Sequence, residues 1–311
     1  MFFTVNMMAK RLRIHSVLKL ICVGMLTILS AKGQTDPVIL KVAAVQFRSS
    51  YDISDNLKRI TAVLDRLAAD NVRVAVFPEC ALTGYTLAPS MPTPETALAA
   101  AEKDLQRTCS ERKIAAVVGT VYKANGHAWD AADVINSRGE LVERYGKMHL
   151  AGEGWAVPGN HIAYFDLEGI PSTVIICHDE RYPEMVRLAA LAGARIVYYV
   201  SAESSLKEES KLAPYRAQMM ARAVENSVYV VAANDPANYD LTGSHGQSRI
   251  IGKDGNILQE ASIFGEDILI STLKLSSSEP NWTSEVLVGP MGAWWRSGLD
   301  WMMQKRHEPL Q

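Results

Sequence analysis

Short apolar runs rich in β-branched residues alternate with amphipathic helical segments, and this alternation strongly constrains the fold of the chain. Residues 38–47 form a continuous β-rich run, as is expected of a strand buried on both faces. Residues 55–69 then place four apolar side chains on one helical face at three- and four-residue spacing: Leu57, Ile60, Leu64 and Leu67. A second buried strand is predicted at 72–77. The pattern predicts an α/β protein with helices outside its sheets.

The first half continues with a helix predicted at 96–112 and a strand at 114–122, and the second half of the chain repeats this order. Its strands are predicted at 171–176, 195–200 and 228–233, and its helices at 183–194 and 215–226. Asn125-Gly126 and Arg138-Gly139 predict turns between antiparallel strands, and Lys253-Asp254-Gly255-Asn256 predicts a hairpin joining 248–251 to 257–261. We therefore expect two sheets packed face to face, with helices on the outer faces.

Three short motifs each place one reactive group in or near this framework. Phe77-Pro78-Glu79 supplies a carboxylate, the segment 145–150 supplies the ammonium of Lys147, and the apolar run 174–176 ends at the thiol of Cys177. A thiol that attacks a carbonyl needs a group to take its proton and a positive or N–H-rich site to hold the oxyanion. Glu79 and Lys147 can fill these two roles without a histidine.

The order and flanks of these motifs resemble the nitrilase, or carbon–nitrogen hydrolase, superfamily over residues 38–275. The segment His178-Asp179-Glu180-Arg181-Tyr182-Pro183-Glu184 is similar to that family's nucleophile segment. The resemblance implies a four-layer αββα sandwich, built as one domain with internal pseudo-symmetry. It also implies that Cys177 is the nucleophile, that Glu79 is the general base, and that Lys147 holds the oxyanion with help from the backbone N–H of His178.

Three more residues are candidates for substrate binding. The resemblance implies that Glu153 orients the lysine and the substrate, with a plain loop carboxylate as the alternative. An arginine four residues after the nucleophile meets a substrate carboxylate in relatives that act on ω-amides or N-carbamoyl amino acids, which suggests this role for Arg181. An internal ion pair with a nearby acidic side chain is the alternative for Arg181. Tyr85 either lines the pocket or packs in the interior.

The predicted reaction is hydrolysis of a non-peptide C–N bond in a small amide or N-carbamoyl substrate, through a thioester that water cleaves. Nitrilases proper usually carry tryptophan and glutamate directly after the nucleophile, whereas this chain has His178 and Asp179. This departure favours an amidase or an N-carbamoyl hydrolase. Nitrile hydrolysis, acyl transfer and an inactive scaffold of the same fold are the alternatives.

No cofactor, metal or nucleic-acid partner is expected. A formal net charge of -2 leaves no excess of basic side chains, which a nucleic-acid-binding protein usually has. The histidines after residue 33 lack metal-ligand spacing, and no nucleotide-binding motif is present. Once Cys22 is set aside, Cys80, Cys109 and Cys177 are too few for a disulfide framework.

Residues 1–33 have the layout of a secretory signal peptide. Basic residues between Lys10 and Lys19 precede an apolar run at 20–29, and cleavage is expected after Gly33. This run falls short of the roughly 18 residues expected of a spanning helix. We predict an exported protein, periplasmic or secreted, whose hydrolase domain is residues 34–275. An uncleaved anchor is one alternative, and a later start codon, leaving the protein cytoplasmic, is another.

The segment 276–311 is predicted to be a docking tail, because four tryptophans crowd it: Trp282, Trp294, Trp295 and Trp301. A lone tail cannot bury that aromatic surface. The tail is expected to dock on its own core or across a homodimer or higher homo-oligomer, since C-terminal segments of the resembling family often cross a dimer. Membrane association is a third, weaker alternative.

Overall fold

The computed structural model describes residues 37–88, 92–207 and 212–275 of the chain. Residues 39–275 lie within one compact unit. The predicted signal peptide and docking tail fall outside the described residues, so export, the homodimer and the chain divisions at 33 and 276 stay predictions. None of the described helices is long and apolar enough to cross a membrane.

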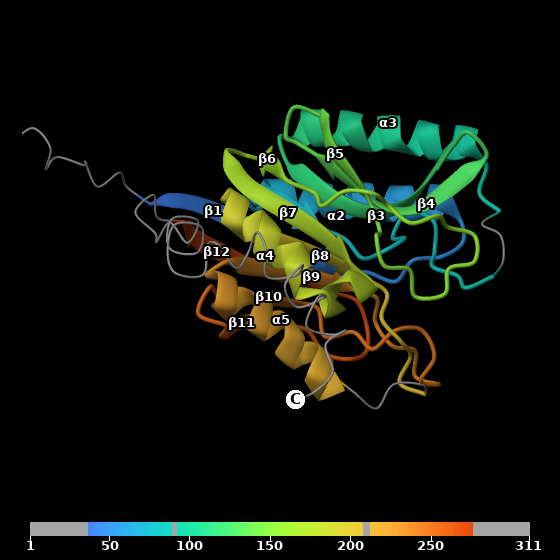
Figure 1. The fold of residues 1–311 in the computed structure, drawn as a ribbon. Helices are drawn as coiled ribbons and strands as arrows, with labels where there is room; N and C mark the ends of the chain where they lie inside the picture. The colour runs from blue at the N-terminus through green and yellow to red at the C-terminus, as the bar shows by residue number, and fades with distance from the viewer. Residues whose placement is uncertain (1–36, 89–91, 208–211, 276–311) are drawn as a thin grey trace, which may run out of the picture. The chain divides into compact units, whose positions relative to one another are not determined.

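Two six-stranded sheets form the centre of this unit (Figure 1). The first has the strand order β12-β1-β2-β3-β4-β5 and consists of β1 (Val38–Gln46), β2 (Val74–Val76), β3 (Ala115–Ala124), β4 (His127–Ile135), β5 (Leu141–Gly146) and β12 (Asp267–Leu275). Strands β1, β2 and β3 are parallel, whereas β4 and β5 continue the sheet antiparallel.

The second sheet has the order β11-β10-β9-β8-β7-β6 and repeats this arrangement. Its strands are β6 (Phe165–Leu167), β7 (Ile170–Ile176), β8 (Ile196–Ser201), β9 (Tyr229–Asn234), β10 (Arg249–Ile251) and β11 (Ile257–Glu260). Strands β7, β8 and β9 are parallel, and the outer strands are antiparallel.

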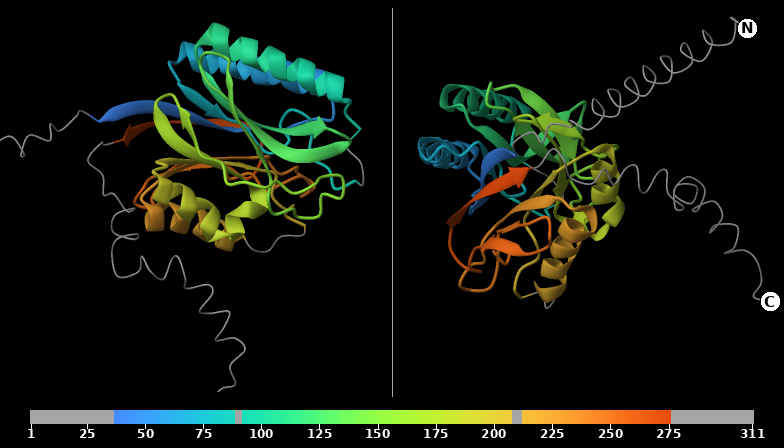
Figure 2. Two further views of the ribbon diagram at one scale, coloured as in Figure 1. Left: turned by 45° about the horizontal axis from the view of Figure 1, so that its top comes forward. Right: turned by 90° about the vertical axis from the view of Figure 1, so that its left-hand side faces the viewer.

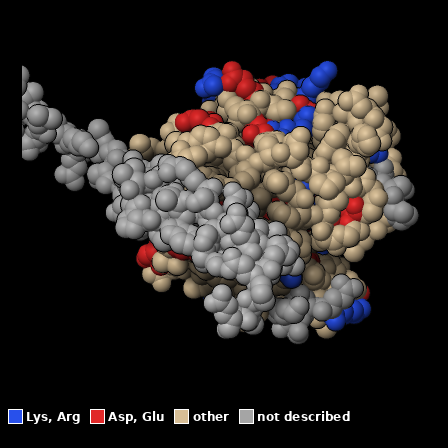
Figure 3. Space-filling view, viewed as in Figure 1, with Lys and Arg blue, Asp and Glu red and all other residues tan. Residues whose placement is uncertain are grey.

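Helices cover the outer face of each sheet and give the four predicted layers (Figure 2). Helices α2 (Ile53–Ala69) and α3 (Glu95–Arg112) lie on the first sheet, and α4 (Pro183–Ala192) and α5 (Leu212–Asn226) lie on the second. One apolar cluster fills the space between the sheets, and another joins the first sheet to its helices. Acidic and basic side chains are interspersed over α3 (Figure 3), where they pair within the helix, as Arg107 does with Asp104.

Local chemistry explains where the helices begin and end. The side chain of Asp52 caps α2 by accepting hydrogen bonds from the backbone N–H groups of Ser54 and Asp55. Proline stands at the first position of α4, and Gly193 ends that helix in the left-handed conformation with a φ of 115°. The helix predicted at 183–194 therefore stops at Ala192. The other predicted elements are confirmed to within a few residues, whereas β6 and β12 are not predicted by the sequence pattern.

Candidate active site

Glu79 and Cys177 follow the carboxyl ends of equivalent strands in the two sheets. Glu79 comes after β2, in a turn that packs directly on β3 at Gly119. A Cβ atom at Gly119 would lie 2.0 Å from the carbonyl oxygen of Pro78, so only glycine allows this approach. Cys177 comes directly after β7 and begins a 3₁₀ turn with a φ of 42°, in the left-handed region. Such a turn projects the thiol away from the strand that carries it.

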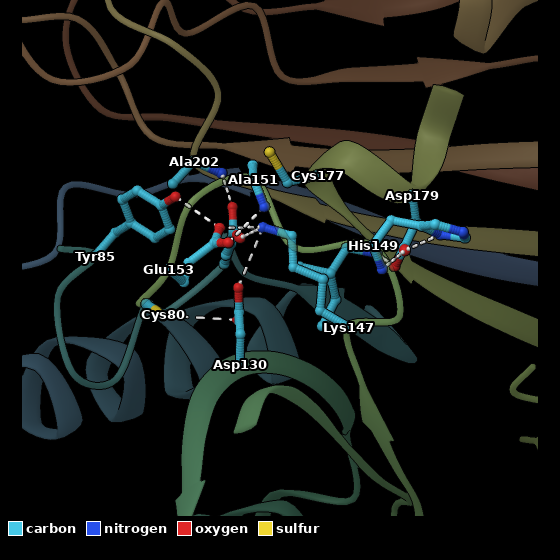
Figure 4. A network of polar contacts seen from close by, with 12 residues as sticks. Cys80, Tyr85, Asp130, Lys147, His149, Ala151, Glu153, Cys177, Asp179 and Ala202 are labelled. Carbon is cyan, nitrogen blue, oxygen red and sulfur yellow. Dashed lines mark hydrogen bonds and ion pairs between the residues drawn. The ribbon is translucent and has the colours of Figure 1, made fainter. Parts of the chain in front are cut away.

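Lys147 lies at the centre of a buried cluster of carboxylates (Figure 4). Its Nζ is 2.6 Å from Oε1 of Glu79 and 2.6 Å from Oε1 of Glu153. A third carboxylate oxygen, Oδ2 of Asp130, lies 3.3 Å away. Burial alone would lower the pKa of Lys147, but the negative charge around it, that of Glu79 foremost, raises it above its usual range. The lysine is therefore a permanent cation.

Further donors hold the carboxylates of Glu79 and Glu153. Oε2 of Glu79 accepts a hydrogen bond of 2.7 Å from the backbone N–H of Ala202, which follows β8 in the second sheet. Glu153 accepts from the hydroxyl of Tyr85 at 2.7 Å and from the backbone N–H of Ala151 at 2.6 Å. Although burial would raise the pKa of Glu153, Lys147 and these bonds lower it. Glu79 and Glu153 are thus fixed on either side of the ammonium.

Asp130, on β4, is a member of this cluster that the sequence motifs do not predict. Its one signal in the sequence is its position inside a strand, where a carboxylate is unusual. Oxygens of Glu79, Asp130 and Glu153 all lie within 4.8 Å of one another, which is close enough for three metal ligands. The ammonium of Lys147 already occupies the space among them, so we assign no metal ligands here.

Cys177 lies beside this cluster, next to Ala151 and Ala202 (Figure 4). Burial and the charge of Glu79 raise the pKa of its thiol well above the usual range, with Lys147 opposing them. The resting thiol is therefore neutral, and it needs a base to become a nucleophile. Glu79 is the ionisable group whose charge acts most strongly on it.

Asp179 joins the lysine segment to the nucleophile turn. Its carboxylate accepts hydrogen bonds from the hydroxyl of Tyr145 at 2.7 Å, from the backbone N–H of His149 at 2.9 Å and from that of Ile176 at 3.2 Å. The ring nitrogen Nδ1 of His149 lies 3.0 Å from the same carboxylate. This fully buried side chain fixes Lys147 and Cys177 relative to each other, because it contacts residues on both sides of Lys147 and also Ile176, which directly precedes Cys177.

Two cavities meet at Cys177. The larger, of about 680 Å³, is lined largely by polar residues, among them Arg48, Tyr85, Glu203, Lys207 and Asp235. The smaller, of about 380 Å³, is lined by His178, Glu180, Arg181 and Tyr215. The predicted substrate-binding residues thus divide between two cavities. Tyr85 lines the larger one while bonding to Glu153, whereas Arg181 lines the smaller one and donates a hydrogen bond of 2.7 Å to the hydroxyl of Tyr215.

A second buried ion pair, between Glu203 and His245, reaches both cavities and is not predicted from the sequence. Glu203 also accepts a hydrogen bond of 2.6 Å from the hydroxyl of Tyr199, whose oxygen lies 3.3 Å from the carbonyl oxygen of Cys177. Burial would lower the pKa of His245, but its hydrogen bond with Glu203 and the charge of that carboxylate raise it. The negative charge of Glu203 is therefore compensated.

Comparisons with known proteins identify the family and the fold of the chain. Residues 41–280 match the family described as carbon-nitrogen hydrolase. The chain is 28% identical to the 2-oxoglutaramate amidase of Bacillus subtilis over 70% of its own length and 85% of the relative, and 27% identical to an omega-amidase of Saccharomyces cerevisiae over 75% and 87%. An amidase from Nesterenkonia sp. AN1, solved as a double mutant with acrylamide, superposes with a TM-score of 0.69 at 23% identity, covering 75% of this chain and 90% of that one.

That likeness confirms the predicted nitrilase-like fold. The family match covers far more than half of the chain. The protein therefore belongs to the carbon–nitrogen hydrolase family and is a hydrolase acting on C–N bonds.

Proposed function

We propose that this protein is an amidase that cleaves a small amide through a thioester on Cys177 and releases ammonia. The observation that carries the proposal is the meeting of Glu79, Lys147 and Cys177, from three separate segments, beside a cavity of about 680 Å³. A carboxylate, a permanent cation and a neutral thiol are the groups that acyl transfer to sulfur requires.

The proposed reaction has two halves. Glu79 takes the proton of the Cys177 thiol, and the resulting thiolate attacks the carbonyl carbon of the amide. Lys147 and the backbone N–H of His178 stabilise the oxyanion, after which Glu79 returns the proton to the nitrogen and ammonia leaves. Glu79 then takes a proton from water, which attacks the thioester, and returns that proton to the sulfur of Cys177 as the acid is released. Glu153 holds the lysine in place throughout.

The larger cavity favours an amide that also carries a carboxylate. Arg48 and Lys207 bring two positive charges to its wall. Of the two acidic residues there, Glu203 is paired with His245, and burial raises the pKa of Asp235 well above its usual range. The names of the similar proteins, 2-oxoglutaramate amidase and omega-amidase, support the same substrate class. N-carbamoyl amino acids share the carboxylate and belong to the same proposal.

The test is ammonia release by the purified protein from ω-amides of dicarboxylates, N-carbamoyl amino acids, aliphatic amides and nitriles. We expect carboxylate-bearing amides to be preferred, and Cys177→Ala and Glu79→Gln each to lower kcat by about 10³-fold or more. Cys109→Ala is the matched control, because this buried thiol lies in the cluster beneath α2 and α3. Turnover that persists in Cys177→Ala contradicts the proposed mechanism.

Lys207→Met tests the proposed substrate class separately. The exposed lysine lines the larger cavity, so its positive charge can attract a substrate carboxylate. Its loss is expected to raise KM about tenfold for carboxylate-bearing amides and to leave KM for aliphatic amides unchanged. An equal change for both substrates removes the support for a carboxylate.

A further inference from the structure

Asp130 has fewer hydrogen-bond donors around its carboxylate than Glu79 or Glu153 has. Its side chain is completely buried, and its Oδ1 accepts one weak hydrogen bond, of 3.8 Å, from the thiol of Cys80. Its Oδ2 has no hydrogen-bond donor, because the ammonium of Lys147, 3.3 Å away, makes its short contacts to Glu79 and Glu153. An ionised carboxylate in this place would be buried with little compensation.

The charges around Asp130 lead to the same conclusion. If all three carboxylates were ionised, the cluster would hold three negative charges against one ammonium. Like charges this close in a dry interior are not all ionised at neutral pH. Burial and the charge of Glu79 raise the pKa of Asp130 well above its usual range, and Lys147 opposes them only in part. The ionisable groups that face Asp130 are Glu79 and Cys80 after β2, Tyr145 on β5, and Lys147 and Glu153 in the loop beyond.

We propose that Asp130 is a neutral carboxylic acid that donates a hydrogen bond from Oδ2 to Glu79, and that it thereby acts as a positioning residue for the proposed base. Protonation turns an oxygen without a donor into a donor, and Glu79, which has a carboxylate oxygen within 4.8 Å of one of Asp130, is its acceptor in this proposal. The effect of Asp130 on catalysis rests on the proposed function, whereas its protonation state is independent of that function.

A neutral Asp130 has a clear consequence for the cluster. Glu79 then faces a donor instead of another negative charge, and Lys147 faces two negative charges instead of three, so that it can better stabilise an oxyanion. When Asp130 loses its proton at alkaline pH, an uncompensated negative charge appears 3.3 Å from the ammonium. The rate is therefore expected to fall with the ionisation of Asp130.

Asp130→Asn tests this, because asparagine is neutral at every pH and keeps both a donor and an acceptor. We expect kcat/KM within about threefold of the wild type at pH 7, and loss of the alkaline decline, because no proton remains to be lost. Asp130→Leu, which has no donor, should lower kcat about tenfold at every pH. Asp133→Asn is the matched control: Asp133 is buried on the same strand but pairs with Arg144 at 2.6 Å, so the alkaline decline should stay.

Difference infrared spectroscopy detects the proton on the Asp130 carboxyl group directly and needs no substrate. The difference spectrum of wild type minus Asp130→Asn at neutral pH should show a positive C=O band of a protonated carboxylic acid, whereas the bands of other protonated carboxyl groups, such as that of Asp235, cancel. Absence of that band, or a hundredfold loss of activity in folded Asp130→Asn, would mean that Asp130 is ionised and would overturn the proposal. If no variant turns over any amide, the proposed function fails while the infrared result still decides the state of Asp130. Carboxyl ¹³C NMR of the wild type decides it if Asp130→Asn does not fold.

Discussion

The Asp179→Ala substitution removes the carboxylate that joins the lysine segment to the nucleophile turn. Three hydrogen bonds, from Tyr145, His149 and Ile176, end on this side chain at 2.7, 2.9 and 3.2 Å. Alanine fills none of the acceptor positions. The completely buried Tyr145 hydroxyl and the N–H of Ile176 would then have no acceptor in an interior that excludes water.

The cost follows from these contacts. A buried donor left without its partner costs about 1–3 kcal/mol, and hydrogen bonds to charged groups lie at the upper end of that scale. Because the bonds share one carboxylate and are not additive, we expect Asp179→Ala to lower the free energy of unfolding by about 3–5 kcal/mol. Asp179→Asn keeps the shape, but its NH₂ must face one backbone N–H, so a loss of about 1–3 kcal/mol is expected.

Urea unfolding, followed by tryptophan fluorescence, measures these changes. Asp166→Ala is the control, because this exposed aspartate makes one hydrogen bond of 2.8 Å, to the backbone N–H of Gly169, and its loss should cost less than about 1 kcal/mol. Both Asp179 variants should also lose activity, since Lys147 and Cys177 are no longer held together. Equal urea midpoints for Asp179→Ala and Asp166→Ala would refute the reasoning.

Two further predictions concern stability. Gly119→Ala should lower the free energy of unfolding by about 3 kcal/mol or more and displace Glu79, because its Cβ would lie 2.0 Å from the carbonyl oxygen of Pro78. The Cβ of Gly126→Ala meets nothing within 4 Å, so this variant should lose only about 1 kcal/mol, for its positive φ. Similar melting temperatures for the two variants would contradict this. The pKa of His245 is raised in the folded protein, so its pairing stabilises fully below about pH 6.5 and is lost as the pH rises through the raised value. The melting-temperature difference between wild type and His245→Gln should therefore shrink as the pH rises, and a difference that grows would show the opposite linkage.

The framework of the site follows from sequence because its causes are local. The apolar run before Cys177 is a strand buried on both faces, and the motif after it fixes the turn, so residue and element are predicted together. The same holds for Glu79 after β2. In each case the reactive residue follows an element whose periodicity is visible in the sequence.

The rest of the site depends on contacts that no local pattern records. Asp130 reaches Lys147 because β4 crosses the sheet beside β5, and a strand position alone does not reveal that the carboxylate faces the cluster. Glu203 and His245 lie 42 positions apart in the sequence and pair only when the segments after β8 and β9 lie side by side. The sequence does not predict β12 for a related reason: its buried and exposed residues alternate imperfectly, and it joins the far edge of the first sheet.

The hydrogen bond between Glu79 and the backbone of Ala202 spans the two sheets, and Asp179 spans them in the opposite direction. Neither half of the chain therefore carries a working set of groups. A second half folded alone would hold Cys177 as an ordinary thiol, open to oxidants and stray electrophiles. Docking of the first half buries that thiol beside Glu79 and raises its pKa, so protection of Cys177 from alkylation during refolding would report the moment at which the two sheets dock.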